Sequence, residues 1–364
     1  MEVLHGGDLQ QASQRFNVPV EQWIDLSTGI NPDPYAINQL DLSAYHQLPY
    51  LKPAFIQAAQ NYYLGKHNSQ VTSDHLLAVS GSQAVIQLLP QCLPAFPVIV
   101  PELGYQEHRL QWQKAGAKLV DYPSIDHDAS VSSINQLLEH NHQQHLVIIN
   151  PNNPSGLLFS PEQIQKWAQK LGEGAYVIID EAFIDTQPEM SVLKQHYEEN
   201  MVVLRSFGKF FGLAGLRLGF VFANETLIHT LQGRLGLWAI NGPAQSIATT
   251  VFKDEKWQQQ ARIDINEAAK VNKKLFSALF NSLQNNQILV STVAHEALFS
   301  SYCLPIGEAK KLVEFFAYRG ILLRLIEFNG ECALVRIGRI NVHHSKAVQS
   351  VREAIDSYIA QIKA

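Results

Sequence analysis

Short apolar runs alternate with helix-period patterns along the chain from about residue 76. The apolar runs lack the regular polar alternation of half-exposed strands, which is typical of strands buried on both faces of a sheet. A helix is predicted to begin at Ser160, because Pro161 follows at the first helical position and Gln163 completes a capping pattern. The alternation predicts an α/β fold with a mostly parallel sheet. The predicted strands are 76–80, 98–100, 118–121, 146–149, 176–179 and 202–204.

The last third of the chain has a different pattern. Long helical patterns fill about 225–282, and a closing helix between Val348 and Ile362 carries its apolar residues on one stripe. Between these helices the sequence predicts several short strands. This arrangement indicates a second, smaller α+β domain. The strands are expected near 288–291, 298–303, 321–326 and 333–337.

The length of 364 residues favours about two domains and a core that folds without covalent staples. The first 30 residues have no clear pattern of their own. We assign 1–35 to an N-terminal segment that packs with the small domain and the substrate site. The large domain is expected at 36–245, and the small C-terminal domain at 246–364.

Charge and composition exclude several function classes. Lysine plus arginine number 28 and aspartate plus glutamate 33, a net charge of -5, which argues against non-specific nucleic-acid binding. The three cysteines form no CxxC spacing, so we expect neither a disulfide framework nor a metal site, and the count fits a reducing compartment. The start, MEVLHGGDLQ, does not have the pattern of a secretion signal, and no apolar run reaches about 18 residues. We therefore expect a cytoplasmic protein that does not bind membranes.

Lys209 lies in the segment SFGKFF, directly after the predicted strand 202–204. Its neighbours include Phe207, Phe210 and Phe211, which would partly remove the amine from water. Desolvation disfavours the ammonium form and leaves a neutral amine available for a Schiff base. The simpler interpretation is an exposed lysine whose head group reaches solvent.

Two polar features follow neighbouring strands, where the ligands of parallel sheets bind. Asp180 closes the strand 176–179 and could pair with a cationic ring nitrogen, although it could also be a helix N-cap. The turn NPNNPSG (150–156) follows the strand 146–149, and an amide from it could donate to a phenolate oxygen. A plain turn is the alternative, since Asn, Pro and Gly are turn formers.

Gly81-Ser82-Gln83 lies between a strand and a helix, which suits an anion at the helix N-terminus. Arg217, in GLRLG, would be the basic partner, because guanidinium binds phosphate through two donors. A lysine, an aspartate, a turn amide and a phosphate cradle are the set that pyridoxal phosphate requires. The motifs NPNNPSG, IIDEAF and SFGKFFGLAGLRLGF resemble the fold-type I pyridoxal-phosphate enzymes of the class I/II aminotransferase group. The resemblance covers essentially the whole chain, and implies a large domain with a mostly parallel sheet plus a smaller α+β domain.

A narrower resemblance comes from the N-terminal motifs HGGDL (5–9) and DLSTGINP (25–32). They are similar to the threonine-phosphate decarboxylase branch of cobalamin biosynthesis, which is close to histidinol-phosphate aminotransferase. Phe183 after Asp-Glu-Ala also fits this branch, where many aminotransferases have Tyr.

The resemblance implies a role for each candidate residue. Lys209 forms the Schiff base and shuttles the proton, Asp180 keeps the pyridine nitrogen protonated, and Asn153 holds the cofactor's O3′. Tyr105, in GYQEH, matches the aromatic residue that stacks on the cofactor ring. The residues implied in cofactor binding are Gly81, Ser82, Gln83, Tyr105, Asn153, Asp180, Ser206, Lys209 and Arg217. The residues implied in substrate binding are Arg336, in LVRIG, and Arg324, His5, Gly29 and Asn31.

Three positions depart from the family pattern. The family usually has Tyr just before a Pro in the segment that reaches the neighbouring subunit, whereas this chain reads Leu48-Pro49-Tyr50. Either Tyr50 substitutes, or that hydroxyl contact is missing. Ser155 replaces a common Thr, and Ala-His-Glu-Ala (294–297) stands where one branch carries Asn near the substrate.

The narrower resemblance implies decarboxylation of L-threonine O-3-phosphate to (R)-1-amino-2-propanol O-2-phosphate. The bond that breaks is the Cα bond held perpendicular to the imine plane, and no residue type reports that angle. An aminotransferase acting on a compound such as histidinol phosphate is therefore the alternative, and a non-catalytic pyridoxal-binding protein is a third. Relatives build their sites across a two-fold dimer, so a homodimer is expected.

Overall fold

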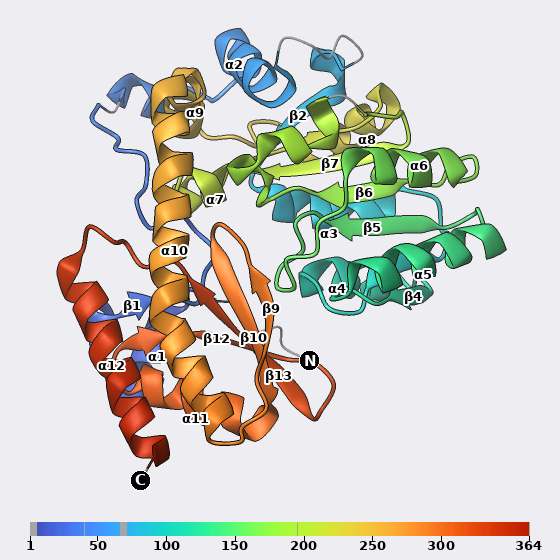
Figure 1. The fold of residues 1–364 in the computed structure, drawn as a ribbon. Coiled ribbons are helices and arrows are strands. Elements are labelled where there is room, and N and C mark those ends of the chain that lie inside the picture. The colour runs from blue at the N-terminus through green and yellow to red at the C-terminus, as the bar shows by residue number, and fades with distance from the viewer. Residues whose placement is uncertain (1–5, 40, 66–70, 195, 364) are drawn as a thin grey trace. The chain divides into compact units, whose positions relative to one another are not determined.

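The computed structural model describes residues 6–39, 41–65, 71–194 and 196–363 (Figure 1). The chain divides into two compact units. The smaller unit contains the described residues up to Asp33, the short segment Pro154–Gly156 and the residues from Gln260 onward. The larger unit contains Pro34–Asn153 and Leu157–Gln259. The domain boundaries expected from sequence stay a prediction.

The larger unit is built on a sheet that has seven strands within the described residues. Strand β8 is antiparallel to both its neighbours, and all the other pairs are parallel. The prediction of a mostly parallel α/β sheet is therefore confirmed. The spatial order is β2 (Leu76–Val79), β8 (Gly219–Phe222), β7 (Met201–Ser206), β6 (Val177–Asp180), β5 (His145–Ile149), β3 (Val98–Pro101) and β4 (Leu119–Tyr122).

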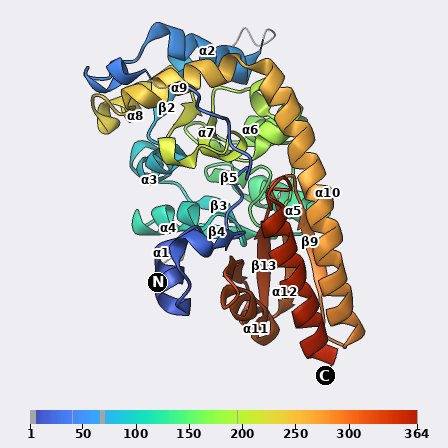
Figure 2. The same cartoon turned by 90° about the vertical axis from the view of Figure 1, so that its left-hand side faces the viewer.

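Burial explains the apolar composition of these strands. Every residue of β2, β3, β5, β6 and β8 is buried, because helices cover both faces of the sheet (Figure 2). The edge strand β4 is only partly buried. Helix α6 begins as predicted, since the Ser160 hydroxyl accepts a hydrogen bond of 3.2 Å from the Gln163 amide. The helices are α2 (Pro53–Leu64), α3 (Ser82–Cys92), α4 (Gln106–Lys114), α5 (His127–His140), α6 (Pro161–Lys170), α7 (Phe207–Phe210), α8 (Glu225–Leu235) and α9 (Gly242–Lys253).

The smaller unit carries an antiparallel sheet in the order β12 (Arg324–Glu327), β13 (Cys332–Gly338), β10 (Phe299–Pro305) and β9 (Ser291–His295). One face of this sheet packs into a core with Phe280, Phe316 and Tyr358. These residues come from α10 (Glu255–Asn285), α11 (Ile306–Ala317) and α12 (Ser345–Lys363).

The N-terminal segment adds to the smaller unit. It contains α1 (Leu9–Phe16) and β1 (Ile24–Asp25), and β1 pairs in parallel with β11 (Ile321–Leu322). This pairing corrects the single strand expected at 321–326, because β11 pairs with β1 while β12 pairs with β13. The strand expected at 288–291 lies instead at Ser291–His295, where it can pair with β10.

Candidate active site

Several predicted residues lie at one edge of the larger unit's sheet. Strands β2, β3, β5, β6 and β7 run in the same direction, so their carboxyl ends meet at that edge. Gly81, Tyr105 and Asn153 follow β2, β3 and β5, while Asp180 and Ser206 end β6 and β7. Ligands of open α/β sheets bind at such an edge.

Asp180 is paired with a histidine that the sequence analysis missed. Its side chain is almost fully buried, and its Oδ2 lies 3.0 Å from His108 Nε2. Its Oδ1 accepts a hydrogen bond of 3.1 Å from the Ala182 amide. His108 stands three residues after Tyr105, and that spacing places both side chains on the same side of one helical turn. The motif GYQEH thus held a signal for this residue, but only the fold brings it to Asp180.

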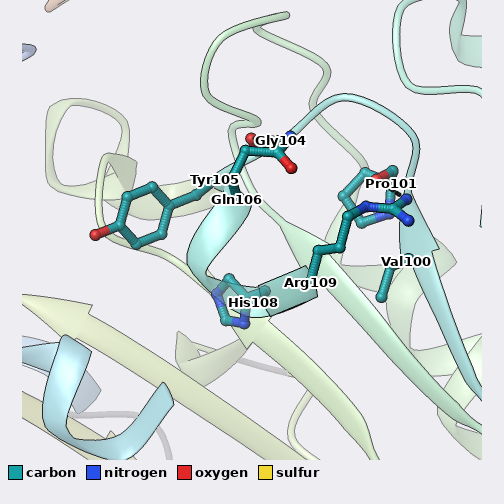
Figure 3. Close-up of a pocket in the computed structure, with 7 residues that line it drawn as sticks. All are labelled: Val100, Pro101, Gly104, Tyr105, Gln106, His108 and Arg109. Atoms are coloured by element: carbon teal, nitrogen blue, oxygen red, sulfur yellow. Dashed lines mark hydrogen bonds between the residues drawn. The ribbon is translucent and has the colours of Figure 1, made fainter. Parts of the chain in front are cut away.

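Tyr105 belongs to a chain of hydrogen bonds. Its hydroxyl donates to Gln83 Oε1 at 3.0 Å, and Gln83 Nε2 donates to Glu107 Oε2 at 2.7 Å. Figure 3 shows Tyr105 and Arg109 extending in opposite directions from the start of α4, with Arg109 beside Pro101. The small cavity between these residues has a volume of about 10 Å³, which is room for one water molecule. The hydrogen bonds hold the Tyr105 ring and the Gln83 amide in fixed positions.

The start of α3 has the shape of an anion cradle. Gly81 has a φ of +81°, and a Cβ there would lie 2.8 Å from Arg217 Nη2. A Cβ on Gly219 would lie 2.6 Å from the Ser82 amide nitrogen. Both glycines thus leave the first amides of α3 open, with an exposed guanidinium beside them. Free amides at a helix N-terminus and an arginine together suit a phosphate group.

Lys209 lies in α7, a single helical turn that follows β7. It is half-buried, and its Nζ lies 5.6 Å from the centroid of the Phe183 ring. A Cβ on Gly208 would lie 2.6 Å from Ala214 Cα, so close packing fixes this turn. The surroundings are apolar, as the sequence analysis expected, because Phe207 and Phe210 are fully buried.

The segment NPNNPSG is a turn that buried asparagine side chains stabilise. Asn150 is buried and closes the turn, since its Nδ2 donates to the Phe159 carbonyl at 3.0 Å and its Oδ1 accepts from the Phe159 amide at 2.8 Å. Asn152 Nδ2 donates to the Leu103 carbonyl at 2.8 Å. These bonds fix the backbone around Asn153, which is half-buried.

A buried ion cluster is formed by residues that neighbour Asp180 and Ser206 in the sequence. Arg205 Nη1 donates to Glu181 Oε2 at 2.8 Å, and its Nη2 pairs with Asp185. Burial lowers the pKa of the Arg205 guanidinium. The nearby charges of Asp185 and Glu181 have the opposite effect, and the pKa is raised overall. The cluster ties the end of β6 to β7, and the sequence analysis did not single it out.

The smaller unit brings two candidate arginines together. Arg324 on β12 lies directly opposite Arg336 on β13, and Arg336 is buried. Burial and the neighbouring Arg324 lower the pKa of Arg336 to about 10, against the opposing effect of Asp25. Arg336 donates to the Ser27 carbonyl, so the DLSTG segment positions this guanidinium.

The N-terminal motifs pack against each other. Asp25 Oδ1 accepts from the Ser27 hydroxyl at 2.6 Å, and the Gly7 amide donates to that hydroxyl at 2.8 Å. A Cβ on Gly6 would lie 2.4 Å from the Ser27 carbonyl oxygen, so the HGG segment needs glycine here.

The remaining candidates for substrate binding are Gly29, Asn31 and His5. Gly29 and Asn31 are buried in the same segment, Asn31 Oδ1 accepts from the Asp33 amide at 3.0 Å, and His5 lies outside the described residues.

Among the residues that the structure describes, no three or more His, Cys, Asp or Glu side chains come together as metal ligands. In the same part of the chain, no helix is both long enough and apolar enough to cross a bilayer.

The family model for class I and II aminotransferases matches residues 21–355. The chain belongs to this family. The resemblance expected from the sequence motifs is confirmed, and the candidate lysine, aspartate and arginine lie within the matched region of this aminotransferase-family chain.

Individual relatives and structures narrow the comparison. A threonine-phosphate decarboxylase of Pseudomonas aeruginosa is 35% identical over 335 residues, which cover 92% of each chain. A histidinol-phosphate aminotransferase of Pelagibacter ubique is 27% identical over 70% of each chain. The structure of an L-threonine-O-3-phosphate decarboxylase from Porphyromonas gingivalis matches with a TM-score of 0.72 at 18% identity, and covers 92% of this chain and 99% of its own. A histidinol-phosphate aminotransferase from Sinorhizobium meliloti, in complex with pyridoxal-5′-phosphate, matches with a TM-score of 0.71 at 16% identity, and covers 98% of this chain and 96% of its own.

Proposed function

We propose that this chain is a pyridoxal-phosphate-dependent threonine-phosphate decarboxylase of cobalamin biosynthesis. It would convert L-threonine O-3-phosphate to (R)-1-amino-2-propanol O-2-phosphate and carbon dioxide. The observation that carries this proposal is the 35% identity to the Pseudomonas aeruginosa decarboxylase over 92% of both chains. Gly7 of the first N-terminal motif donates to the Ser27 hydroxyl of the second, and the Ser27 carbonyl accepts from Arg336, which supports a shared substrate site.

The residues of the larger unit fit pyridoxal phosphate. Gly81 allows the Arg217 guanidinium to lie against the start of α3, where both would bind a phosphate group. Asp180 is buried and paired with His108, which suits a carboxylate that would pair with a cationic ring nitrogen. When bound, the cofactor supplies an aldehyde for an amine and an electron-poor ring that withdraws negative charge from the substrate's Cα.

The chain's own residues would then have distinct tasks. The Lys209 amine, held among aromatic rings, would anchor the cofactor and carry a proton at Nζ. Asp180 would keep a proton on the ring nitrogen, and His108 would hold the Asp180 carboxylate in place. Tyr105 would cover one face of the cofactor ring, and the hydrogen bond from its hydroxyl to Gln83 would hold it in that position.

The substrate carries a carboxylate and a phosphate, in a protein of net charge -5. Local cations must therefore outweigh the overall charge. Arg324 and Arg336 lie opposite each other on adjacent strands, and would bind these two anionic groups. How they orient the carboxylate would decide which Cα bond breaks.

The deciding experiment incubates the cofactor-loaded enzyme with L-threonine O-3-phosphate and no keto acid. We expect release of carbon dioxide and formation of amino-propanol phosphate in equal amounts. Turnover that begins only when a keto acid is added would contradict the proposal. That result would favour a histidinol-phosphate-type aminotransferase, which the 27% identity to the Pelagibacter ubique enzyme keeps as the second candidate.

We also propose that the enzyme acts as a homodimer in the cytoplasm. Large apolar side chains are exposed on the larger unit, among them Leu48, Tyr50 and Trp238. Tyr50 is 67% exposed and its ring stands edge-on to Trp238, with centroids 6.1 Å apart. Exposed apolar groups of this size support a protein interface. A monomeric mass in light scattering at micromolar concentration would contradict the dimer.

A further inference from the structure

Two of the three cysteines lie on neighbouring strands of the smaller unit's sheet. Cys303 on β10 is paired with Leu334 of β13, and Cys332 of β13 is paired with Pro305 of β10. Positions two residues apart on one strand share a face, so both cysteine side chains leave the sheet on the same side. They are diagonal neighbours across one antiparallel ladder.

The two thiols are close together and partly exposed. Both residues are free cysteines of intermediate exposure, and the neighbouring Cys332 thiol contributes to raising the pKa of the Cys303 thiol. Their face of the sheet is the one opposite the helix-covered core, since the adjacent Leu304 and Ala333 are buried in that core. Small reagents in solution can therefore reach the pair.

We propose that Cys303 and Cys332 are a reversible redox pair that glutathione disulfide oxidises to an intramolecular disulfide. One thiolate attacks the glutathione disulfide and releases one glutathione thiolate. The second cysteine then attacks the resulting mixed disulfide and releases a second glutathione. Both protein thiols lose a proton, the two sulfurs form one bond, and the two electrons reside in two molecules of reduced glutathione.

The sheet geometry explains why this disulfide is reversible. Diagonal neighbours in an antiparallel pair have Cα atoms about 7–8 Å apart, whereas disulfides favour about 4.4–6.8 Å. The backbone must therefore shift when the bond forms. Cys332 is the first residue of β13, directly after a turn that contains Gly330, so the shift involves only the end of this strand. A bond formed under such strain is more easily reduced than a structural disulfide.

The protonation of Cys303 adds a pH dependence. Burial, and then the neighbouring Cys332, raise the pKa of the Cys303 thiol. Other polar groups at this site are Ser291 of β9, which is paired with Cys303 and lowers the pKa of that thiol, and Asn329, whose side chain accepts from the Cys332 amide at 2.9 Å. Because the thiolate is the reactive form, we expect the rate of oxidation to rise from pH 7 to pH 9.

The test counts free thiols in the full chain, denatured after incubation with glutathione disulfide. The wild type contains three cysteines and should fall from three free thiols to one. Cys92 lies in the other unit and serves as an internal control, so Cys92→Ser should fall from two thiols to none. Cys303→Ser and Cys332→Ser should each form no internal disulfide, and dithiothreitol should restore every thiol of the wild type.

Peptide mapping identifies the bond. The expected result is one linked peptide pair that contains Cys303 and Cys332. A glutathione adduct on each cysteine without a linked pair would overturn the proposal, as would a cross-linked dimer on a non-reducing gel. Full retention of three thiols under the same conditions would also overturn it. None of these outcomes depends on the proposed decarboxylation.

Discussion

The candidate residues of the larger unit are held in a different way from those of the smaller unit. In the larger unit, polar side chains pair with one another at the strand ends, as Asp180 does with His108 and Tyr105 with Gln83. In the smaller unit, Arg336 is buried opposite a second arginine, and both burial and Arg324 lower its pKa. The first arrangement pairs polar side chains, whereas the second places two guanidinium groups opposite each other, and a bound anion would stabilise their charge. We infer that the larger unit is preorganised for a resident group and the smaller unit for an exchanging anion.

The largest effect is expected at Lys209. Lys209→Ala removes the amine while leaving the buried aromatic residues around it, and should reduce turnover by about 10³-fold or more. Carbon dioxide release measures turnover, and a thermal melt verifies folding. Lys114→Ala, at an exposed site in the same unit, is the matched control and should retain full activity. Activity of the Lys209 variant within tenfold of the wild type would refute the assigned role.

A change at Arg336 tests the other half of the comparison. Arg336→Ala should weaken substrate binding by about 30-fold or more, because losing one partner of a buried charge pair costs about 2–5 kcal/mol. Cofactor affinity should stay unchanged, since the proposed cofactor residues lie in the other unit. Arg336→Lys keeps the charge but loses the two-donor geometry, so it should recover only part of the affinity. Equal losses of substrate and cofactor binding would break the proposed division of tasks.

The pairing in the larger unit can be broken at His108. His108→Phe keeps a ring in the buried site but leaves the Asp180 carboxylate without this partner, at a cost of about 1.5–3 kcal/mol. We expect cofactor affinity, measured by fluorescence titration, to fall about 10- to 100-fold. His108→Gln restores a donor and should recover part of the loss. If both variants bind the cofactor like the wild type, His108 does not position Asp180.

The sequence predicted the strands of the larger unit well, because strands buried on both faces are apolar throughout. The run 146–149 lies in β5 and the run 202–204 in β7. The sequence predicted the smaller unit's strands less well, since the pairing of β11 with β1 joins residues about 300 positions apart. Local patterns carry no information about such a partner.

The same reason explains the site residues that were missed. His108 and Asp180 are 72 positions apart and come together only through the order of β3 and β6 in the sheet. Ser27 was quoted within DLSTG, but its carbonyl contact with Arg336 spans 309 positions. Family motifs identified the proposed cofactor residues, whereas the contacts that His108 and Ser27 make follow only from the fold.

The smallest expected effect concerns Glu296, a second group of the smaller unit whose charged form is disfavoured by burial. Burial raises the pKa of Glu296 to about 7, although Arg339 opposes this. A Cβ on Gly156 would lie 2.9 Å from Glu296 Oε1, so the carboxyl group packs closely against that turn. The folded state therefore binds the Glu296 proton more tightly than the unfolded chain. The resulting stabilisation is complete below about pH 4.5 and is lost as the pH rises through about 7.

Glu296→Gln tests this directly, because the amide stays neutral at every pH. The variant and the wild type should have similar free energies of unfolding at about pH 4.5. At about pH 8.5 the variant should be more stable by about 2 kcal/mol, as measured by urea unfolding. Glu267→Gln, at an exposed position, should show no such difference between the two pH values. A constant offset between Glu296→Gln and the wild type at the two pH values would mean that folding does not raise the pKa of Glu296.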